Sequence, residues 1–260
     1  MEKGVPIRSV SRSISVLQAI NRHGSLSMMA IAKHEKLPYP TAFRIVQTLI
    51  HEGLIEQEPA RKRYRPTALV QSLAHGYHTE SRIVDVARDP IRALTRDVGW
   101  PCFITVRVGT QMVVRDSTHA ETSLTFGLCH PGFTVPLLQS ATGQAFLAYV
   151  PTQDLDDLIR WGNTEEPHEP KLDVDALLVG LRDIRRDGFA SKPCLTPSVH
   201  RSSSIAVPIF KGDNIEAVLT LIYFYTAMKP ATAIERYVER IKAAALEISQ
   251  NFAVADLEMA

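Results

Sequence analysis

The sequence predicts an α+β protein built from two parts, and three observations lead to this class. Apolar residues recur at helical spacing near both ends of the chain, over 10–21 and 231–252. Between them, strand-like runs come in pairs joined by short turns, over 102–116 and 203–224, which indicates an antiparallel sheet flanked by helices. The first 66 residues combine three helical segments with a basic hairpin, so they form a small domain of their own.

The composition fits a chain with a sizeable core and a basic head. Of its 260 residues, 45% are apolar and 22% are charged, which excludes a disordered polar chain. Residues 1–76 hold 11 Lys and Arg against 5 Asp and Glu, a net charge of +6. The remaining residues hold 18 against 23, a net charge of −5. A basic head suggests a polyanion as its partner, with ordinary surface charge as the alternative.

Three helical segments and their boundaries can be placed in the head. The first helix is expected over 10–21 and ends at Gly24. Ser27 is a suitable N-cap for a short second helix. A third helix is expected over 40–52, because Pro40 suits the first helical position and an apolar stripe follows it. Two helices joined by a short turn and followed by a hairpin form a winged helix–turn–helix, assigned to 1–66.

The outer side of the third helix carries side chains that suit DNA. Arginine can pair with guanine and glutamine with adenine, while threonine and histidine can contact bases or phosphates. A solvated helix face is the alternative, but the basic hairpin that follows favours DNA. The hairpin cations would hold phosphates or enter the minor groove of double-stranded DNA. The candidate DNA-binding residues are Thr41, Arg44, Gln47, Thr48, His51, Arg61, Lys62, Arg63 and Arg65.

A linking helix over 67–81 leads to a second domain over 82–260, in which helices flank an antiparallel sheet. Gly109 and the turn at 211–214 separate the paired strands, and Pro90 kinks or restarts the first helix. The expected helices are 82–98, 140–149, 153–161, 173–186 and 231–252, and the expected strands are 102–108, 112–116, 203–210 and 217–224.

Several classes of protein are disfavoured by what the sequence lacks. Cys102, Cys129 and Cys194 are odd in number and far apart, which suggests neither a disulfide framework nor a thiolate metal site. The start of the chain has no signal-peptide pattern, and no run is long and apolar enough to cross a bilayer. Motifs of common hydrolases, nucleotide-binding enzymes and metalloproteases are absent. We therefore expect a cytoplasmic protein with no catalytic residues, metal or cofactor.

Five segments resemble the IclR family of bacterial transcription regulators, in order along nearly the whole chain: SVSRSISVLQAI, LPYPTAFRIVQTLIHEGLI, RYRPTALVQSLAHGY, PLLQSATGQAFLAY and SSSIAVPIF. The segments DVGWPCFITV, MVVRDSTH and LIYFYTAM look most like the branch that regulates catabolism of hydroxyphenylpropionate and related aromatic acids. The resemblance implies a C-terminal effector domain of GAF-like or profilin-like fold, and a homo-oligomer, dimeric or tetrameric.

The chain departs from the family pattern at the helix–turn–helix. Lys36 stands where many members have glycine, and Tyr39-Pro40 stands where they often have serine or threonine. The first change loses a residue that enters the left-handed region freely, and the second loses a side-chain cap. Each loss costs on the order of 1 kcal/mol. These departures affect the fine DNA register more than DNA binding itself.

The effector site is expected around the helix that begins after Ser140. That residue is a suitable N-cap, and the positive end of the helix can hold a carboxylate, although a plain cap is an equal alternative. For Ser204 and Thr220, the alternative to ligand binding is an ordinary structural role in a strand. For Arg115, the alternative is a surface ion pair. The family pattern and these arguments give Ser140, Ala141, Thr142, Thr196, Ser204, Thr220, Tyr223 and Arg115 as effector-binding residues.

Taken together, these features predict a DNA-binding activator of an aromatic-acid catabolic operon. A small aromatic carboxylate would control it from the C-terminal domain, and a dimer would bind a pseudo-palindromic operator. An activator would also have RNA polymerase as a partner. The alternatives are an IclR-type repressor that responds to a non-aromatic small carboxylate such as a keto acid and, less favoured, an enzyme on a sensory-type fold.

Overall fold

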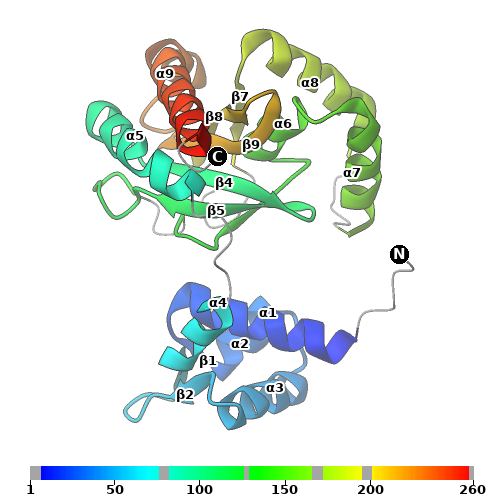
Figure 1. Cartoon of the computed structure of the whole chain (residues 1–260). Coiled ribbons are helices and arrows are strands. Elements are labelled where there is room, and N and C mark those ends of the chain that lie inside the picture. Colours follow the sequence, from blue (N-terminus) through cyan, green and yellow to red (C-terminus); the bar gives the residue numbers. More distant parts are fainter. Residues whose placement is uncertain (1–6, 76–81, 126–128, 166–171, 195–200, 258–260) are drawn as a thin grey trace. The chain divides into compact units, whose positions relative to one another are not determined.

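The chain folds into two compact units, Met1–Thr79 and Glu80–Ala260, each with its own hydrophobic core (Figure 1). The structure is a computed structural model. Helices and antiparallel strands occur in both units, so the α+β class predicted from the sequence is confirmed. The described residues are 7–75, 82–125, 129–165, 172–194 and 201–257.

The first unit is a winged helix–turn–helix with a three-stranded antiparallel sheet in the order β1-β3-β2. Its core contains apolar residues from all three main helices, among them Ile20, Ile31 and Val46. Its elements are α1 (Arg8–His23), β1 (Leu26–Ser27), α2 (Met28–His34), α3 (Tyr39–His51), β2 (Ile55–Gln57), β3 (Arg63–Pro66), the 3₁₀ helix η1 (Ala68–Gln71) and α4 (Ser72–His75).

Local chemistry explains where these helices begin and end. Ser27 caps α2, because its hydroxyl accepts a hydrogen bond from the Ala30 amide at 3.3 Å. Gly24 and Gly53 follow α1 and α3 with φ of 72° and 71°, a region that glycine enters without steric cost. Lys36, in the turn between α2 and α3, has a φ of 50° although it carries a side chain.

Several helix boundaries in the first unit differ from the sequence prediction, and α1 extends beyond the expected 10–21 at both ends. Helix α3 begins at Tyr39, one residue before Pro40, and Pro38 occupies the N-cap position without a side-chain hydrogen bond. The expected linking helix is not one continuous α-helix, because η1 precedes the short α4. Tyr77 and the rest of 76–81 lie outside the described residues. The assignment of 67–81 as a linker therefore stays a prediction.

The second unit is built on a six-stranded sheet in the order β6-β5-β4-β9-β8-β7, and all its neighbouring strands are antiparallel. Its elements are α5 (Arg82–Val98), β4 (Cys102–Val108), β5 (Gln111–Ser117), β6 (Thr134–Pro136), α6 (Ala141–Leu147), α7 (Thr152–Glu165), α8 (Val174–Asp187), β7 (Ala190–Pro193), β8 (Ser202–Lys211), β9 (Asn214–Phe224) and α9 (Pro230–Leu257).

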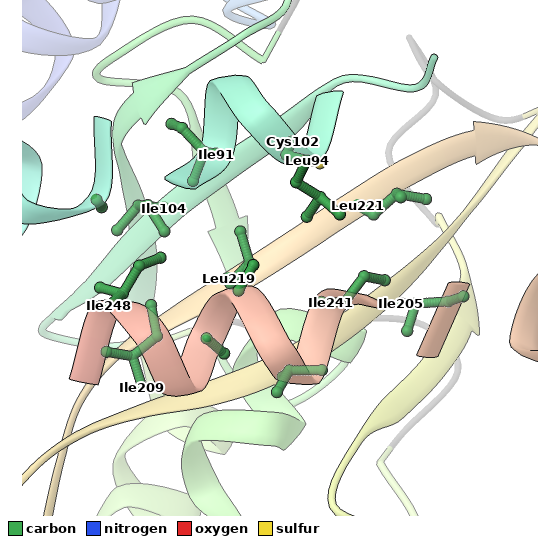
Figure 2. Packing of buried hydrophobic residues seen from close by; sticks show 14 of the residues in the cluster. Ile91, Leu94, Cys102, Ile104, Ile205, Ile209, Leu219, Leu221, Ile241 and Ile248 are labelled. Atoms are coloured by element: carbon green, nitrogen blue, oxygen red, sulfur yellow. The ribbon is translucent and has the colours of Figure 1, made fainter. Parts of the chain in front are cut away.

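Helices cover the two faces of this sheet with different cores. On one face, α5 and α9 pack on alternate residues of β4, β8 and β9; Figure 2 shows Ile205, Leu219 and Leu221 next to Ile241 of α9. On the other face, a second core joins α6, α7 and α8 to Ala206 of β8. The period-2 alternation of the strands thus sends neighbouring residues into separate cores.

Most of the elements expected in the second unit are present, and two short strands had not been expected. The strand over 102–108 and the helix over 82–98, which contains Pro90, match β4 and α5. Strands β6 and β7 are three and four residues long, and they pair with β5 and β8. Within the described part of the chain, no helix has the length and apolar character required to span a membrane.

Candidate functional site

Helix α3 exposes a polar and aromatic face opposite its buried stripe. Ala42, Ile45, Val46 and Leu49 are buried in the first unit's core. The expected DNA-contacting residues Arg44, Gln47, Thr48 and His51 are exposed, and Thr41 is half-buried. The side chains that point away from the core are therefore mostly those predicted from the sequence.

Two exposed aromatic residues extend this face toward the start of the helix. Tyr39 and Phe43, which the sequence analysis missed, are 50% and 43% exposed, and their rings lie 15° from parallel with centroids 6.5 Å apart. Both precede Gln47 at four-residue intervals, so the three side chains form one row. That spacing in the sequence could have revealed them.

The other flank of α3 borders a groove of about 690 Å³ between α1 and α3. Thr41, Arg44 and Thr48 line it together with Arg12 of α1, and the Thr48 hydroxyl donates to the Arg44 carbonyl at 3.0 Å. Apolar side chains of α1 and α4 also border the groove, including Ile14 and Leu73, which are 52% and 65% exposed.

The hairpin between β2 and β3 presents its four expected cations on the surface. Arg61 and Lys62 are exposed in the turn. Arg63 donates to the Ser25 hydroxyl at 3.0 Å, and Arg65 forms an exposed ion pair with Glu56 at 2.6 Å. The last two arginines are thus held against the first unit, whereas the first two project from the turn.

The second unit contains a cavity of about 40 Å³ on the α6 side of its sheet. Two aromatic rings contribute to its apolar wall, Phe103 of β4 and Phe133, together with Ile222 of β9. Ser140, Ala141, Thr142 and Ser204, four of the residues expected to bind an effector, also line it. None of the described lining residues carries a formal charge.

Hydroxyl groups at the start of α6 are fixed by hydrogen bonds. The Ser140 hydroxyl accepts from the Gly143 amide at 2.9 Å and donates to the Pro136 carbonyl at 2.6 Å. Thr142 and Thr220 are buried, and their hydroxyl oxygens lie 3.0 Å apart. Thr220 therefore supports the wall from behind, because it contacts Thr142 and is not itself a lining residue.

Gly143 makes this arrangement possible. A Cβ atom at this position would lie 2.0 Å from the Leu137 carbonyl oxygen, so α6 packs directly on the preceding backbone. Side-chain atoms never approach backbone atoms so closely. Only glycine allows the first turn of α6 to take this place beside the cavity.

Two cysteines line the same cavity, which the sequence analysis did not anticipate. Burial raises the pKa of Cys129 to about 12, with a further contribution from Cys194, and burial also raises the pKa of Cys194. Both thiols are therefore protonated near neutral pH and behave as small polarizable groups rather than nucleophiles. Their positions in the sequence, 65 residues apart, gave no indication that they meet.

Besides Thr220, three further residues expected at the effector site are not found among the lining residues. Tyr223 packs in the core beneath α5 and α9, with its ring centroid 6.3 Å from that of Trp100, because strand alternation turns it away from the face to which Ile222 points. Arg115 lies on β5 and does not line the cavity. Thr196 lies outside the described residues. The described residues also contain no cluster of three or more side chains that could hold a metal ion.

A winged helix–turn–helix joined in one chain to an α+β unit is the architecture of a transcriptional regulator. Comparison with protein families agrees: residues 9–59 match the IclR helix-turn-helix domain, and residues 75–250 match the C-terminal domain of the bacterial transcriptional regulator IclR. The chain therefore belongs to the IclR family. Members of this family are DNA-binding transcriptional regulators rather than enzymes.

Two curated relatives are similar over part of their length. The probable transcriptional regulator SauR of Cupriavidus necator is 26% identical over 148 residues, 57% of this chain and 58% of the relative. The HTH-type transcriptional regulator TsaQ1/TsaQ2 of Comamonas testosteroni is 24% identical over 161 residues, 59% of this chain and 55% of the relative. The alignments thus span less than two thirds of these relatives.

Solved structures share the fold over almost the whole chain. A transcriptional regulator of Rhodococcus sp. RHA1 superposes with a TM-score of 0.68 at 18% identity, covering 96% of this chain and 100% of that one. An IclR homologue of Microbacterium hydrocarbonoxydans, crystallised with 4-hydroxybenzoate, has a TM-score of 0.66 at 20% identity, with 95% and 99% coverage. At this level of identity the likeness establishes the fold.

Proposed function

We propose that this chain activates an aromatic-acid catabolic operon and that a small aromatic carboxylate bound in the second unit controls it. The observation that carries the proposal is the cavity itself, which is lined by two phenyl rings together with Ser140, Thr142 and Ser204. Apolar walls with a few convergent polar groups are typical of small-molecule sites. The complex of the Microbacterium homologue with 4-hydroxybenzoate supports the same ligand class.

Backbone amides at the start of α6 would hold the carboxylate, because the described lining residues supply no cation and the Ser140 and Ser204 hydroxyls donate to the carbonyls of Pro136 and Lys192. Thr142 and Ala141 occupy the first two positions of α6, and their amides have no partner four residues earlier within that helix. Phe103 and Phe133 would contact the ring on its apolar side. We assign no direct ligand contact to Thr220, which acts through Thr142.

A short keto acid is the second candidate ligand, and the size of the cavity favours it. About 40 Å³ gives room for roughly three water molecules, so a ring requires the cavity to enlarge. A keto acid has the same carboxylate chemistry with a smaller body. The protein would then be an IclR-type repressor with a non-aromatic effector.

The working form would be a homo-oligomer, dimeric or tetrameric, on a pseudo-palindromic operator in the cytoplasm. The first unit leaves a stripe of apolar side chains exposed on α1 and in the η1–α4 segment: Val10, Ile14, Leu69 and Leu73. Val10, Ile14 and Leu73 border the same groove between α1 and α3, and exposed apolar side chains that gather in this way mark an interaction site. Two copies joined in this way would place two α3 helices on one operator, and an activator would then contact RNA polymerase.

On DNA, the bases would be read by Arg44, Gln47 and His51. Bases or phosphates would be contacted by Thr41 and Thr48. The DNA backbone would be held by the hairpin cations Arg61, Lys62, Arg63 and Arg65. The ligand changes DNA affinity only if it binds the two arrangements of the protein unequally. The proposal therefore requires that one acid alter the dissociation constant for DNA.

Fluorescence anisotropy of the full chain on the DNA upstream of its gene tests this function. Titrations at two salt concentrations, with and without 4-hydroxybenzoate, a hydroxyphenylpropionate and pyruvate, should show salt-sensitive binding that one aromatic acid alters. A response to pyruvate alone would favour the keto-acid regulator. Specific binding that no acid alters would reject the effector assignment, and absence of specific binding would reject the DNA-binding surface.

A cavity-filling variant tests where the ligand binds. Ser204→Phe should abolish the response to the acid and leave DNA binding intact, because the ring occupies the cavity. Val179→Phe, at a 49% exposed position on α8, is the matched control and should respond normally. An unchanged response in Ser204→Phe would place the effector elsewhere.

Deletion of the gene tests the sign of regulation. It should lower transcription of the operon under inducing conditions, and a rise would identify a repressor.

A further inference from the structure

The exposed aromatic pair on α3 lies outside the polar residues assigned to DNA so far. Tyr39 and Phe43 are on the first turns of the helix, and half of the Tyr39 side chain is open to solvent. Their rings stack on each other and not on the core. Large apolar side chains that stay exposed beside a functional helix face call for a partner surface.

Position on the helix indicates what that partner is. The residues at the start of a recognition helix are those that contact base edges in the major groove. Phe43 lies directly before Arg44 in the chain and one helical turn before Gln47, both of which are exposed. The first unit carries a net charge of +6 over residues 1–76, which suits a polyanionic surface and not an apolar protein groove.

The chemistry of the major groove then selects the group. Each base edge there presents hydrogen-bond donors and acceptors, and the thymine C5-methyl is the apolar group among them. A phenyl ring has no hydrogen-bonding atom to offer the other bases. We infer that Phe43 reads the methyl group of a thymine in each operator half-site, with Tyr39 stacked behind it as a positioning residue.

This inference rests on the proposed DNA-reading surface and adds a base preference to it. Gln47 suits adenine and Arg44 suits guanine. The preferred half-site should therefore contain a thymine next to the base pairs read by these two side chains. Removal of the methyl from that thymine leaves every hydrogen bond of the base pair in place, so it isolates the contact with Phe43.

The experiment replaces thymine by deoxyuridine, one position at a time. The full chain first selects its preferred sequence from a random duplex library, and anisotropy then measures each substituted duplex. Wild type should lose about fourfold in affinity for one position in each half-site, the effect of one buried methyl. Phe43→Ala should bind the unmodified duplex more weakly and show no loss with deoxyuridine at that position.

Two further variants complete the design. Phe43→Leu keeps an apolar contact and should retain part of the deoxyuridine effect, which separates loss of the contact from loss of folding. Met29→Ala, at a 69% exposed position on α2, is the matched control and should retain the full effect. Circular dichroism should show all variants folded.

Three results would overturn the inference. The first is that the wild type shows no deoxyuridine effect at any position. The second is that Phe43→Ala retains the effect. The third is that Phe43→Ala changes the oligomeric mass but not the deoxyuridine profile, which would make Tyr39 and Phe43 a protein contact. If the wild type selects no sequence at all, the DNA-reading surface fails as well. Selection of a sequence without a Phe43-dependent thymine rejects this inference alone.

Discussion

Thr142 of α6 and Thr220 of β9 join helix and sheet through buried hydroxyls 3.0 Å apart. One of the two hydroxyls donates to the other, and Thr142 is also a lining residue of the cavity. Thr142→Val leaves the Thr220 hydroxyl without this partner and should cost about 1–3 kcal/mol of unfolding free energy. Chemical denaturation measures it.

The double variant Thr142→Val/Thr220→Val provides the internal check of that pair. Because replacing both hydroxyls removes the unsatisfied group, its cost should be less than the sum of the single costs. Additive costs would show that the two hydroxyls do not interact. The response to the effector should be weakened in both variants that lack the Thr142 hydroxyl.

Gly143→Ala should destabilise the second unit severely. The new methyl would meet the Leu137 carbonyl oxygen at 2.0 Å and its carbon at 2.5 Å, so backbone must move. We expect a loss of more than about 3 kcal/mol. Gly180→Ala on α8, where nothing lies within 4 Å of a Cβ, is the control and should gain about 0.5–1 kcal/mol. Thermal unfolding of both variants distinguishes these opposite signs.

Lys36→Gly should stabilise the first unit. Lys36 holds a φ of 50°, which costs a residue with a side chain about 1–2 kcal/mol. Glycine removes this strain but gives up about 0.5–1 kcal/mol in chain entropy, so a net gain of about 0–1.5 kcal/mol remains. Lys36→Ala loses the same charge and keeps the strain. A gain in the alanine variant equal to that in the glycine variant would attribute the effect to charge instead.

Alkaline pH should destabilise the fold through the cavity thiols. Burial raises the pKa of Cys129 to about 12, while an unfolded thiol has a pKa of about 8.5. The stabilising contribution of the protonated thiol is therefore present below about pH 8.5 and is lost as pH rises toward 12. Between pH 8.5 and 10.5, the unfolding free energy should fall by about 2 kcal/mol less in Cys129→Ala than in the wild type. Parallel pH profiles would contradict this.

Ile14→Glu should shift the oligomer toward smaller species. Ile14 is half exposed on the apolar stripe proposed as the oligomer contact, and a carboxylate there would need desolvation in the interface. Sedimentation velocity should show the change, together with weaker operator binding. Met29→Glu, at an exposed position on α2, is the control. If both variants keep the wild-type mass, the interface lies elsewhere.

Sequence reasoning located the long elements because each has many residues that repeat one period. Helix α5 and strand β4 have the predicted bounds. Strands β1, β6 and β7 were not foreseen, since two to four residues show no period and their place depends on pairing with distant strands. Pairing across the sheet is information that no local window contains.

The candidate sites show the same division. Ser140, Thr142 and Ser204 reach the cavity as the sequence and family pattern suggested. Tyr223 was expected at the cavity, but its neighbour Ile222 lines the cavity instead. Because successive residues of a strand point to opposite faces, a shift of one residue places Tyr223 in the other core. Cys129 and Cys194 meet only through folding. On α3, Phe43 was not predicted as a DNA-contacting residue, because the prediction selected polar side chains and Phe43 is apolar.

The alternation of β9 separates what must be preserved from what can vary. Leu219, Leu221 and Tyr223 face the α5–α9 core, whereas Thr220 and Ile222 face the cavity side. Mutational drift at the cavity positions can therefore change the inducer while the other face keeps the scaffold stable. A lineage carrying this fold can acquire new metabolic cues by substitutions on one side of a single strand, which makes the domain readily evolvable as a sensor.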